Sequence, residues 1–300
     1  MHALGSRLPF RVGMVLIAAA DDRAWGSAGA AGLRAIESRG LAEVSLRDRV
    51  PPSGWESAFD ELVREGCGLV FGHGGELSES IHHAALAHPQ TWFACLNGSR
   101  TADNLAVLEI DDAQLGFLAG VLAARVSPTG RVGFIGGLSI PPTLRQAEGF
   151  SRGARFAGSE ALTAVTGSFD DPALARESAL NLVKGGAGAL YYYLNEAWRG
   201  VLQAGSEQGC RVIGSVVDRH ADAPSVVCGS VLQHVDHVYL AALQLALAGR
   251  LSGQLYTFGL ETGAGSLSPL YDVSGEIRKQ MAELEQALAA GIILVSSMNL

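Results

Sequence analysis

The chain has 300 residues, of which 48% are hydrophobic and 17% are charged, and its formal net charge is −8. This composition excludes a disordered protein, because charge is sparse and apolar residues suffice for a core. The negative balance excludes nucleic acid as a partner, since phosphate binding needs clustered Lys and Arg. A chain of 300 residues exceeds one typical core and predicts two domains.

Short apolar runs alternate with longer helical patterns in the first part of the chain, and glycines or prolines mark most junctions. The expected strands are Val12–Ala18, Glu43–Leu46, Gly68–Phe71, Thr91–Leu96 and Leu105–Glu109, and the expected helices are Trp25–Ser38, Trp55–Glu65 and Glu76–Ala87. Continuous apolar strands joined by helices indicate a parallel sheet covered on both faces.

A helix at Ala113–Arg125 then leads into a second half with the same alternation, as internal repeats require. Its expected strands are Arg131–Ile135, Leu162–Thr166, Ala189–Tyr193, Arg211–Gly214 and Val226–Cys228, and its expected helices are Leu144–Phe156, Pro172–Lys184 and Ala197–Gln208. A helix at Val235–Ala248 and a strand near Leu255–Phe258 follow, and we expect both to return to the first lobe.

The sequence therefore predicts an α/β protein of two Rossmann-like lobes joined by several crossing segments. We expect the first lobe to comprise residues 1–110 with about 236–262, and the second 111–235 with about 263–300. Ligands of open parallel sheets bind beyond the carboxyl ends of the strands. Two such sheets predict a ligand cleft between the lobes, a preferred place for small molecules.

Polar and aromatic residues follow the strands of the first lobe. Asp21, Asp22 and Trp25 come after the first strand, where carboxylates can accept from hydroxyl or ring N–H groups and an indole can stack on a flat ring. An Asp at this position can equally cap the next helix. His73 follows the third strand as a pocket donor or a turn residue, and Asn97 follows the fourth as a base-edge reader or an Asn-Gly turn.

The second lobe offers a similar set of candidate ligand-binding residues. Tyr192 and Tyr193 end a strand, where successive side chains alternate between faces, so we expect one ring to form a stacking wall. Asp218 lies beyond its strand as a hydroxyl acceptor or as a turn residue. The further candidates in this lobe are Arg145, Asn195 and Trp198.

Catalytic and metal-binding patterns are not found in the sequence. It has no GxSxG, no HExxH and no convincing triad or paired carboxylates, so we expect no enzyme and no cofactor. The four cysteines form no CxxC or Cys/His cluster, which argues against a zinc site and favours buried structural thiols: Cys67, Cys95, Cys210 and Cys228.

An ordered set of short motifs resembles the basic membrane protein family, the substrate-binding lipoproteins that include the purine nucleoside receptor A type. The central signature is Arg131–Gly137 with Ile140-Pro141 and Arg145, followed by Glu148-Gly149-Phe150 and Gly153. The other matches, in order, are Asp22 with Trp25, Phe117–Gly120, Gly167–Pro172, Ser230-Val231-Leu232 with Val235-Asp236, and Gly291-Ile292. The resemblance extends from about residue 11 to residue 295.

This resemblance implies a type I periplasmic-binding-protein fold that closes on purine nucleosides or related compounds for an ABC importer. In such proteins the base stacks between aromatic residues of the two lobes, and carboxylates and a lysine hold the ribose. Asp22, Asn97 and Asp218 match carboxylate positions of the family, with an amide in the case of Asn97. We expect the base to lie between Trp25 and the Tyr192–Trp198 side.

Several positions depart from the family pattern. Asp21 stands where Asn is frequent, Trp25 replaces a Phe, and Gln233 stands where a ribose-binding Lys is usual. Trp198 adds a bulky ring to a loop that is glycine-rich in the family. We expect a bulkier pocket without the lysine to prefer a free base or another flat heterocycle over a nucleoside.

The expected partners are a small-molecule ligand and an ABC permease, with the chain itself a monomer. The apolar stretch Val12–Ala20 is interpreted as the first strand and not as a signal peptide, since no small-residue cleavage site follows. We expect a periplasmic or membrane-anchored protein whose signal has been removed. The alternatives are a cytoplasmic sensor on the same fold and a nucleoside-processing enzyme.

Overall fold

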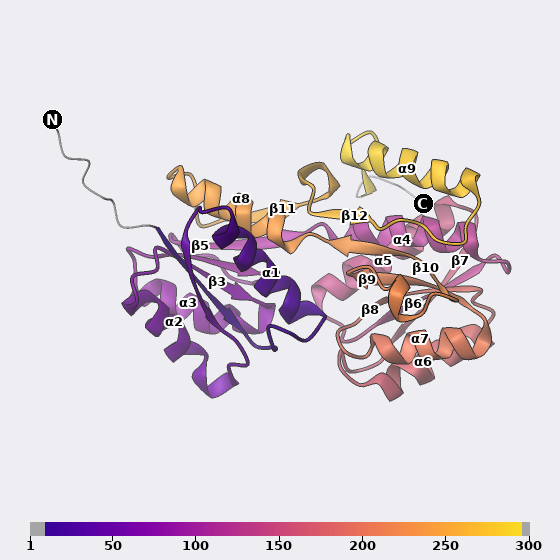
Figure 1. The fold of residues 1–300 in the computed structure, drawn as a ribbon, viewed down its shortest axis with the longest axis horizontal. Helices are drawn as coiled ribbons and strands as arrows, with labels where there is room; N and C mark the ends of the chain where they lie inside the picture. Colours follow the sequence, from indigo (N-terminus) through magenta and orange to yellow (C-terminus); the bar gives the residue numbers. More distant parts are fainter. Residues whose placement is uncertain (1–9, 296–300) are drawn as a thin grey trace. The chain divides into compact units, whose positions relative to one another are not determined.

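The computed structural model describes residues 10–295 of the chain. They form two compact units, each built on one six-stranded sheet (Figure 1). The first unit contains the residues up to Glu109 together with Val235–Thr257. The second contains Ile110–His234 together with the residues from Phe258 onward. The chain therefore passes between the units three times.

The sheet of the first unit has the strand order β11-β5-β4-β3-β1-β2, and β1 to β5 pair in parallel. Its elements are β1 (Arg11–Leu16), α1 (Trp25–Ser38), β2 (Glu43–Arg47), α2 (Trp55–Arg64), β3 (Leu69–His73), α3 (Ser78–Ala87), β4 (Trp92–Leu96), β5 (Leu105–Ile110), α8 (Val235–Leu247) and β11 (Leu255–Phe258). Helices α1 and α8 pack together on one face, and α2 and α3 cover the other (Figure 1).

The sheet of the second unit has the order β12-β10-β9-β8-β6-β7, parallel except for β12. Its elements are α4 (Asp112–Val126), β6 (Arg131–Gly136), α5 (Pro141–Phe156), β7 (Glu160–Val165), α6 (Pro172–Lys184), β8 (Ala189–Tyr193), α7 (Trp198–Gln208), β9 (Arg211–Val216), β10 (Val227–Gln233), β12 (Gly265–Leu267) and α9 (Gly275–Ala289). Helices α4 and α5 cover one face, α6 and α7 cover the other, and α9 packs on α4 (Figure 1).

Both sheets repeat one topology, which confirms the predicted α/β fold class. The order β2-β1-β3-β4-β5 in the first unit matches β7-β6-β8-β9-β10 in the second. In each sheet the direction of strand addition reverses beside the first strand of the repeat, β1 or β6. Parallel strands with this order bind ligands beyond their carboxyl ends at that reversal.

Sequence reasoning missed two elements and shortened a third. Strand β12 has three residues, too few for a periodic pattern, and α9 follows it outside the repeating alternation. Strand β10 was predicted as Val226–Cys228 but continues to Gln233. Ser230 interrupts its apolar run. It can be buried because its hydroxyl accepts from the backbone N–H of Arg219 at 3.0 Å and its own N–H donates to the Ser268 hydroxyl at 2.8 Å.

Helices α4 and α5 cross with their backbones in direct contact. A Cβ added to Gly120 or to Gly153 would lie 2.1 Å from a carbonyl oxygen of the other helix. One helical turn away, a Cβ added to Gly116 or to Gly149 would lie 2.2 or 2.1 Å from a carbonyl oxygen of the other helix. Only glycine allows this distance, so four glycines of the sequence fix how the two helices cross.

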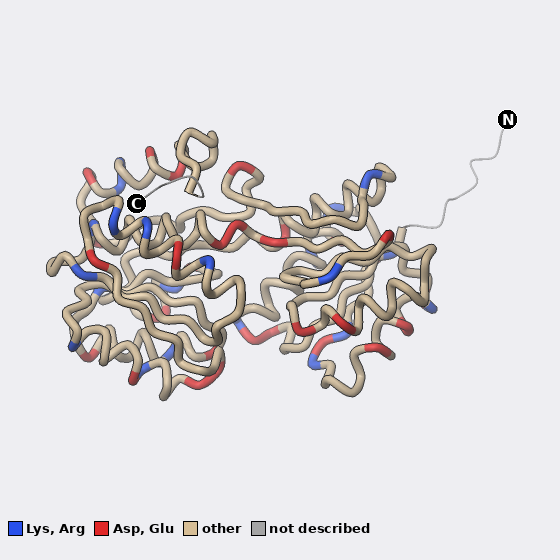
Figure 2. The backbone as a smooth tube through the Cα atoms, turned by 180° about the vertical axis from the view of Figure 1, so that it is seen from behind, with Lys and Arg blue, Asp and Glu red and all other residues tan. Residues whose placement is uncertain are grey.

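Charged positions are scattered over both units. Figure 2 shows Lys and Arg interspersed with Asp and Glu along the backbone and not gathered in one region. A polyanion would need a clustered basic surface, so the arrangement fits the net charge of −8. Within residues 10–295, no helix is both long and apolar enough to cross a membrane.

The glycine contact between α4 and α5 can be tested with one added methyl group. We expect Gly120→Ala to lower the free energy of unfolding by about 1–3 kcal/mol, because a Cβ there must push the helices apart. Gly275→Ala is the matched control, since nothing lies within 4 Å of its added Cβ and Ala favours the helix. Urea unfolding followed by circular dichroism measures both, and equal stability of the two variants would contradict the proposed backbone contact.

Candidate functional site

The first candidate region lies at the carboxyl end of the first sheet, where β1 and β3 are neighbours. The loop after β1 leads into Trp25, the first residue of α1, and β3 ends at His73. The two rings stack with centroids 4.3 Å apart and planes inclined by 27°. The structure thus brings together two residues that are 48 positions apart in the sequence.

His73 is buried, with 1% of its surface exposed, and both of its ring nitrogens have partners. Nε2 lies 2.9 Å from the backbone carbonyl oxygen of Trp25, and Nδ1 lies 2.5 Å from the hydroxyl of Tyr239 in α8. A carbonyl oxygen only accepts, so Nε2 carries the proton and the Tyr239 hydroxyl donates to Nδ1. Burial lowers the pKa of His73 to about 4, against smaller opposing effects of the Trp25 carbonyl and Asp22.

The two predicted carboxylates of the first loop are engaged in local structure. Asp22 accepts from the backbone N–H groups of Ala24, Gly26 and Ser27 at 2.8, 2.9 and 2.8 Å. These contacts cap the start of α1, which is the alternative role that sequence reasoning left open. Asp21 is exposed and forms an ion pair with Arg49 at 2.9 Å.

Asn97 lies at the end of β4 beside the glycines that follow β3. Its backbone has a φ of +60°, and its carbonyl oxygen would be 2.5 Å from a Cβ on Gly75. Gly74 has a φ of +127°, a conformation that other residues avoid. The Gly74-Gly75 pair therefore allows the close approach of the β3 and β4 loops, and Asn97 occupies a turn in which its half-buried side chain hydrogen-bonds no other described residue.

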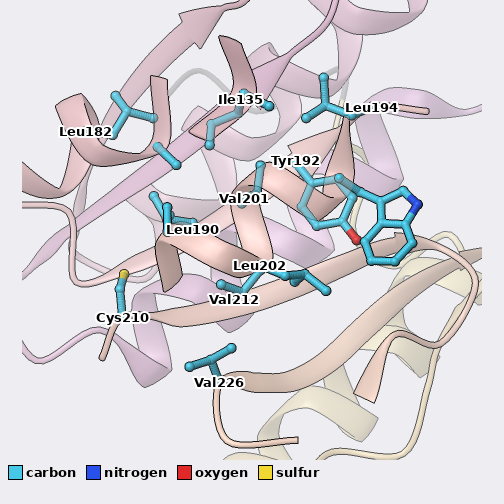
Figure 3. Close-up of a cluster of buried hydrophobic side chains, with 14 of the residues drawn as sticks. Ile135, Leu182, Leu190, Tyr192, Leu194, Val201, Leu202, Cys210, Val212 and Val226 are labelled. Atoms are coloured by element: carbon cyan, nitrogen blue, oxygen red, sulfur yellow. The ribbon is translucent and has the colours of Figure 1, made fainter. Parts of the chain in front are cut away.

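The second candidate region is the carboxyl end of the second sheet, where three tyrosines end β8. Tyr192 points into the core between the sheet and α6–α7, among Val201, Leu202 and other apolar side chains (Figure 3). It is 1% exposed, and burial raises its pKa to about 12. Tyr191 and Tyr193 project from the opposite face, as alternation along a strand requires.

Tyr191 belongs to a buried polar network between α4, α5 and β8. Its hydroxyl donates to Gln146 Oε1 at 2.6 Å, and Gln146 Nε2 donates to Asp112 Oδ1 at 3.1 Å. Arg145 Nη2 lies 3.3 Å from Asp112 Oδ2. Asp112 is only 2% exposed and stands in the first turn of α4, where the helix dipole favours a carboxylate.

Tyr193 and Gln233 lie beside this network, at the ends of β8 and β10. Burial raises the pKa of Tyr193 well above its usual value, Asp112 adds to the rise, and a hydrogen bond from Gln233 opposes it. The ring of Phe169 stands edge-on to Tyr193, with centroids 6.2 Å apart. The Phe169 ring also covers Gly137, where a Cβ would lie 2.2 Å from it.

Trp198 begins α7 and is 5% exposed. Guanidinium groups cover the ring, with Arg219 at 4.1 Å and Arg199 at 4.6 Å from its centroid. Asn195, in the preceding loop, donates to the Asp170 carboxylate at 2.7 Å. Trp198 is thus a buried ring in contact with two cations, and its stacking on a ligand stays a prediction.

Asp218 holds together the loop after β9. It accepts from the hydroxyl of Tyr271 at 2.8 Å, the backbone N–H of His220 at 3.1 Å and the hydroxyl of Ser230 at 3.3 Å. The His220 and Tyr271 rings stack at 3.6 Å above it. This is a loop-forming role, the alternative noted from sequence.

Seven buried side-chain atoms lack a hydrogen-bond partner among the described residues, and three of those near the carboxyl end of the second sheet are relevant to ligand binding. They are Thr143 Oγ1 in the first turn of α5, Trp198 Nε1 at the start of α7 and Gln233 Oε1 at the end of β10. Buried polar groups in proteins are nearly always satisfied. Such unsatisfied donors and acceptors at strand ends make these residues candidate contacts for a polar ligand.

Sequence reasoning missed several residues of these two regions. Tyr239, Asp112, Gln146 and Thr143 lie inside helical patterns, where their periodicity is indistinguishable from that of ordinary helix positions. Phe169 could have been found, because it stands in the loop after a strand of the repeat. The structure brings Trp25 to His73, brings Arg145 and Tyr193 to Asp112, and brings Gln233 to Tyr193.

The four cysteines are buried and free, as predicted for structural thiols. Burial raises the pKa of Cys95 to about 12 and that of the other three to about 11, so all remain protonated at neutral pH. In residues 10–295, no group of three or more His, Cys, Asp or Glu side chains could hold a metal ion.

The buried neutral His73 predicts a specific pH dependence of stability. An unfolded chain protonates a histidine near pH 6.5, whereas folded His73 resists protonation until about pH 4. The folded state therefore loses stability as pH falls through this window, by about 3 kcal/mol at pH 4. We expect urea unfolding of wild type to show this loss relative to His73→Phe, and parallel pH profiles for the two proteins would contradict it.

Comparison with known proteins identifies relatives along nearly the whole chain. A purine-binding protein of Brucella abortus is 21% identical over 79% of this chain and 67% of the relative. The transcriptional activator protein Med of Bacillus subtilis is 28% identical over 87% of this chain and 84% of the relative.

The fold also matches solved structures. An ABC transporter solute-binding protein from Aeropyrum pernix K1 superposes with a TM-score of 0.80 at 22% identity, covering 95% of this chain and 93% of that one. This match confirms the predicted type I periplasmic-binding-protein fold. Residues 10–296 match the family described as ABC transporter substrate-binding protein, PnrA-like, and the chain belongs to that family.

Proposed function

We propose that this protein captures a purine base or purine nucleoside and delivers it to an ABC permease. The observation that carries the proposal is the Trp25 ring, held against His73 at the strand-order reversal of the first sheet. A flat ring in this position can stack on a nucleobase, and such stacking contributes about 1–3 kcal/mol per base. The purine-binding relative from Brucella abortus supports the same ligand class.

The polar atoms of the second unit support a ligand that both donates and accepts hydrogen bonds. Gln233 Oε1 accepts, Trp198 Nε1 donates, and Thr143 Oγ1 can do either. The edge of a purine carries ring nitrogens and exocyclic groups of both kinds. Leaving a buried donor or acceptor unpaired costs about 1–3 kcal/mol, so a ligand that satisfied them would gain that amount for each group.

The charge of the site favours an uncharged ligand over a nucleotide. Arg145 is next to the buried carboxylate of Asp112, and Arg219 is next to Asp222, with 3.5 Å between the charged atoms. A phosphate group would need cations that are not already neutralised. A base or nucleoside makes no such demand.

The second aromatic contact is proposed to be Phe169. Tyr192 is enclosed in the core and Trp198 is covered by guanidinium groups, whereas Phe169 is half-buried beyond the end of β7. We propose that Phe169 offers the ligand a flat ring in the second unit, as Trp25 does in the first. Ligand binding then stabilises a closed form through contacts that exist only when the ligand is bound. The site serves capture rather than turnover, and the protein acts outside the cytoplasm.

A regulatory role is the second candidate, because Med of Bacillus subtilis is named a transcriptional activator and matches 87% of this chain. The same ligand-driven closure would then signal to a protein partner. Uptake of a radiolabelled purine by cells with and without the gene distinguishes the two. Unchanged uptake together with altered transcript levels would favour the regulator.

The ligand class can be tested by mass spectrometry of the small molecule released on denaturation, and by calorimetry with purine bases and nucleosides. We expect Trp25→Ala to weaken binding at least fivefold, because the stacking face is lost, and Trp25→Phe to retain most of the affinity. Trp55→Phe serves as the control for a ring change outside the site. Equal affinity of wild type and Trp25→Ala would rule out stacking on Trp25.

Gln233 is expected to decide how strongly a sugar contributes. A neutral amide donates more weakly to hydroxyl groups than an ammonium group does, so wild type should bind adenine or guanine at least as tightly as the corresponding nucleoside. Gln233→Lys should shift the preference toward the nucleoside by about tenfold. Calorimetry of both ligands with both proteins measures the shift, and a wild type that strongly prefers nucleosides would refute this role.

A further inference from the structure

Three residues from distant parts of the chain form a row of rings in the first unit, in which Trp25 stacks on His73 and Tyr239 is tilted against His73 by 57°. Trp25 starts α1, His73 ends β3 and Tyr239 belongs to α8. The ring centroids are 4.3 Å apart for Trp25 and His73, and 6.0 Å apart for His73 and Tyr239. Each end of the His73 ring is fixed by a hydrogen bond, one to Trp25 and one to Tyr239.

Helix α1 packs directly against the His73 and Tyr239 rings. A Cβ on Gly29 would lie 2.8 Å from the His73 ring, and a Cβ on Gly32 would lie 2.6 Å from the Tyr239 ring. Both glycines face these rings, so the backbone of the helix is in direct contact with them. Such packing leaves the rings no alternative rotamer without moving the helix.

The hydrogen bonds of His73 also act on the backbone of Trp25. Nε2–H donates to the carbonyl oxygen of Trp25, while Asp22 accepts from the N–H groups just before and after that residue, at Ala24 and Gly26. Trp25 is therefore held by its ring and by its backbone. An aromatic contact held in place before binding costs less side-chain entropy when the ligand arrives.

We propose that His73 is a positioning residue, which acts through Trp25 and fixes the indole in the orientation that stacks on the ligand, with Tyr239 fixing His73 in turn. The proposal rests on Trp25 as the ligand contact of the proposed function. His73 itself touches no ligand, because both of its ring nitrogens and one ring face are already engaged.

A double-mutant cycle tests whether His73 acts through Trp25. His73→Phe keeps a ring of similar size but removes both hydrogen bonds, and Tyr239→Phe removes only the hydroxyl. We expect His73→Phe to weaken purine binding at least fivefold, and Tyr239→Phe to weaken it less. In a Trp25→Ala background neither change should alter the affinity for purines, because the indole that these residues position is missing. Calorimetry with adenine and guanine measures all the variants.

The matched control is Tyr256→Phe, which removes a hydroxyl bonded to Ser252 at 2.9 Å in the same unit. It should leave binding unchanged in both backgrounds. If His73→Phe weakens binding equally with and without Trp25, its role is structural and the proposal is wrong. Circular dichroism checks that each variant is folded.

A second readout needs no ligand and so separates this proposal from the proposed function. Protonation of His73 would place an imidazolium against the indole, which quenches tryptophan emission more than neutral imidazole does. The difference in emission between wild type and Trp25→Phe isolates Trp25 among the four tryptophans. The other titratable groups that act on His73 and Tyr239 are Asp22 and Cys95.

We expect the Trp25 emission to stay constant from pH 8 to pH 5 and to fall near pH 4, in line with the low pKa of His73. In His73→Phe that step should disappear. A step in the Trp25 emission near pH 6.5, or no step while the protein remains folded, would contradict the stacking of a buried, neutral His73 on Trp25. If the quenching is seen but no purine binds, the proposed function fails while the positioning of Trp25 by His73 stands.

Discussion

Parallel strands all end at the same edge of a sheet. This constraint determines where the polar and aromatic side chains of the loops can come together in this protein. In each unit the strand order reverses beside the first strand of the repeat, so the loops that follow two neighbouring strands leave in opposite directions and open a place for side chains. Trp25 and His73 occupy that place in the first unit. In the second, Thr143 and Trp198 follow the two equivalent strands.

The two units use the same topology for different purposes. The first unit offers an aromatic ring, Trp25, which is fixed by a neutral histidine. Its two loop carboxylates are engaged elsewhere, since Asp22 caps a helix and Asp21 forms a surface ion pair. The second offers polar atoms on a rigid base, because the glycine contact of α4 with α5 holds Asp112, Gln146 and Tyr191 in register. A flat ligand with donors and acceptors on its edge suits both. Binding specificity can change in the loops without altering either sheet.

Much of the candidate site could be located from the sequence, but few of the side-chain roles could be assigned. Periodicity and glycine punctuation correctly placed residues 21–25, 97, 195–198 and 218 beyond strand ends, whereas His73 is the last residue of its strand. Position beyond a strand does not say what a side chain contacts. Asp22 and Asp218 could each bind a ligand or form a loop; in the structure both hydrogen-bond within their loops, and their ligand contacts stay predictions. Tyr192 and Tyr193 differ by one position and therefore face opposite sides of β8.

The sequence by itself determined the two α/β repeats, the strand ends and the absence of clustered basic charge, because these depend on local periodicity and composition. Only the tertiary structure decided which rings and polar groups meet. His73 is neutral because packing buries it, and Tyr239, 166 residues away, donates to its Nδ1. The buried carboxylate of Asp112 is satisfied by residues more than 30 positions away. Such contacts join elements whose spacing in the chain carries no periodic signal, so their partners appear only once the sheets and helices are packed.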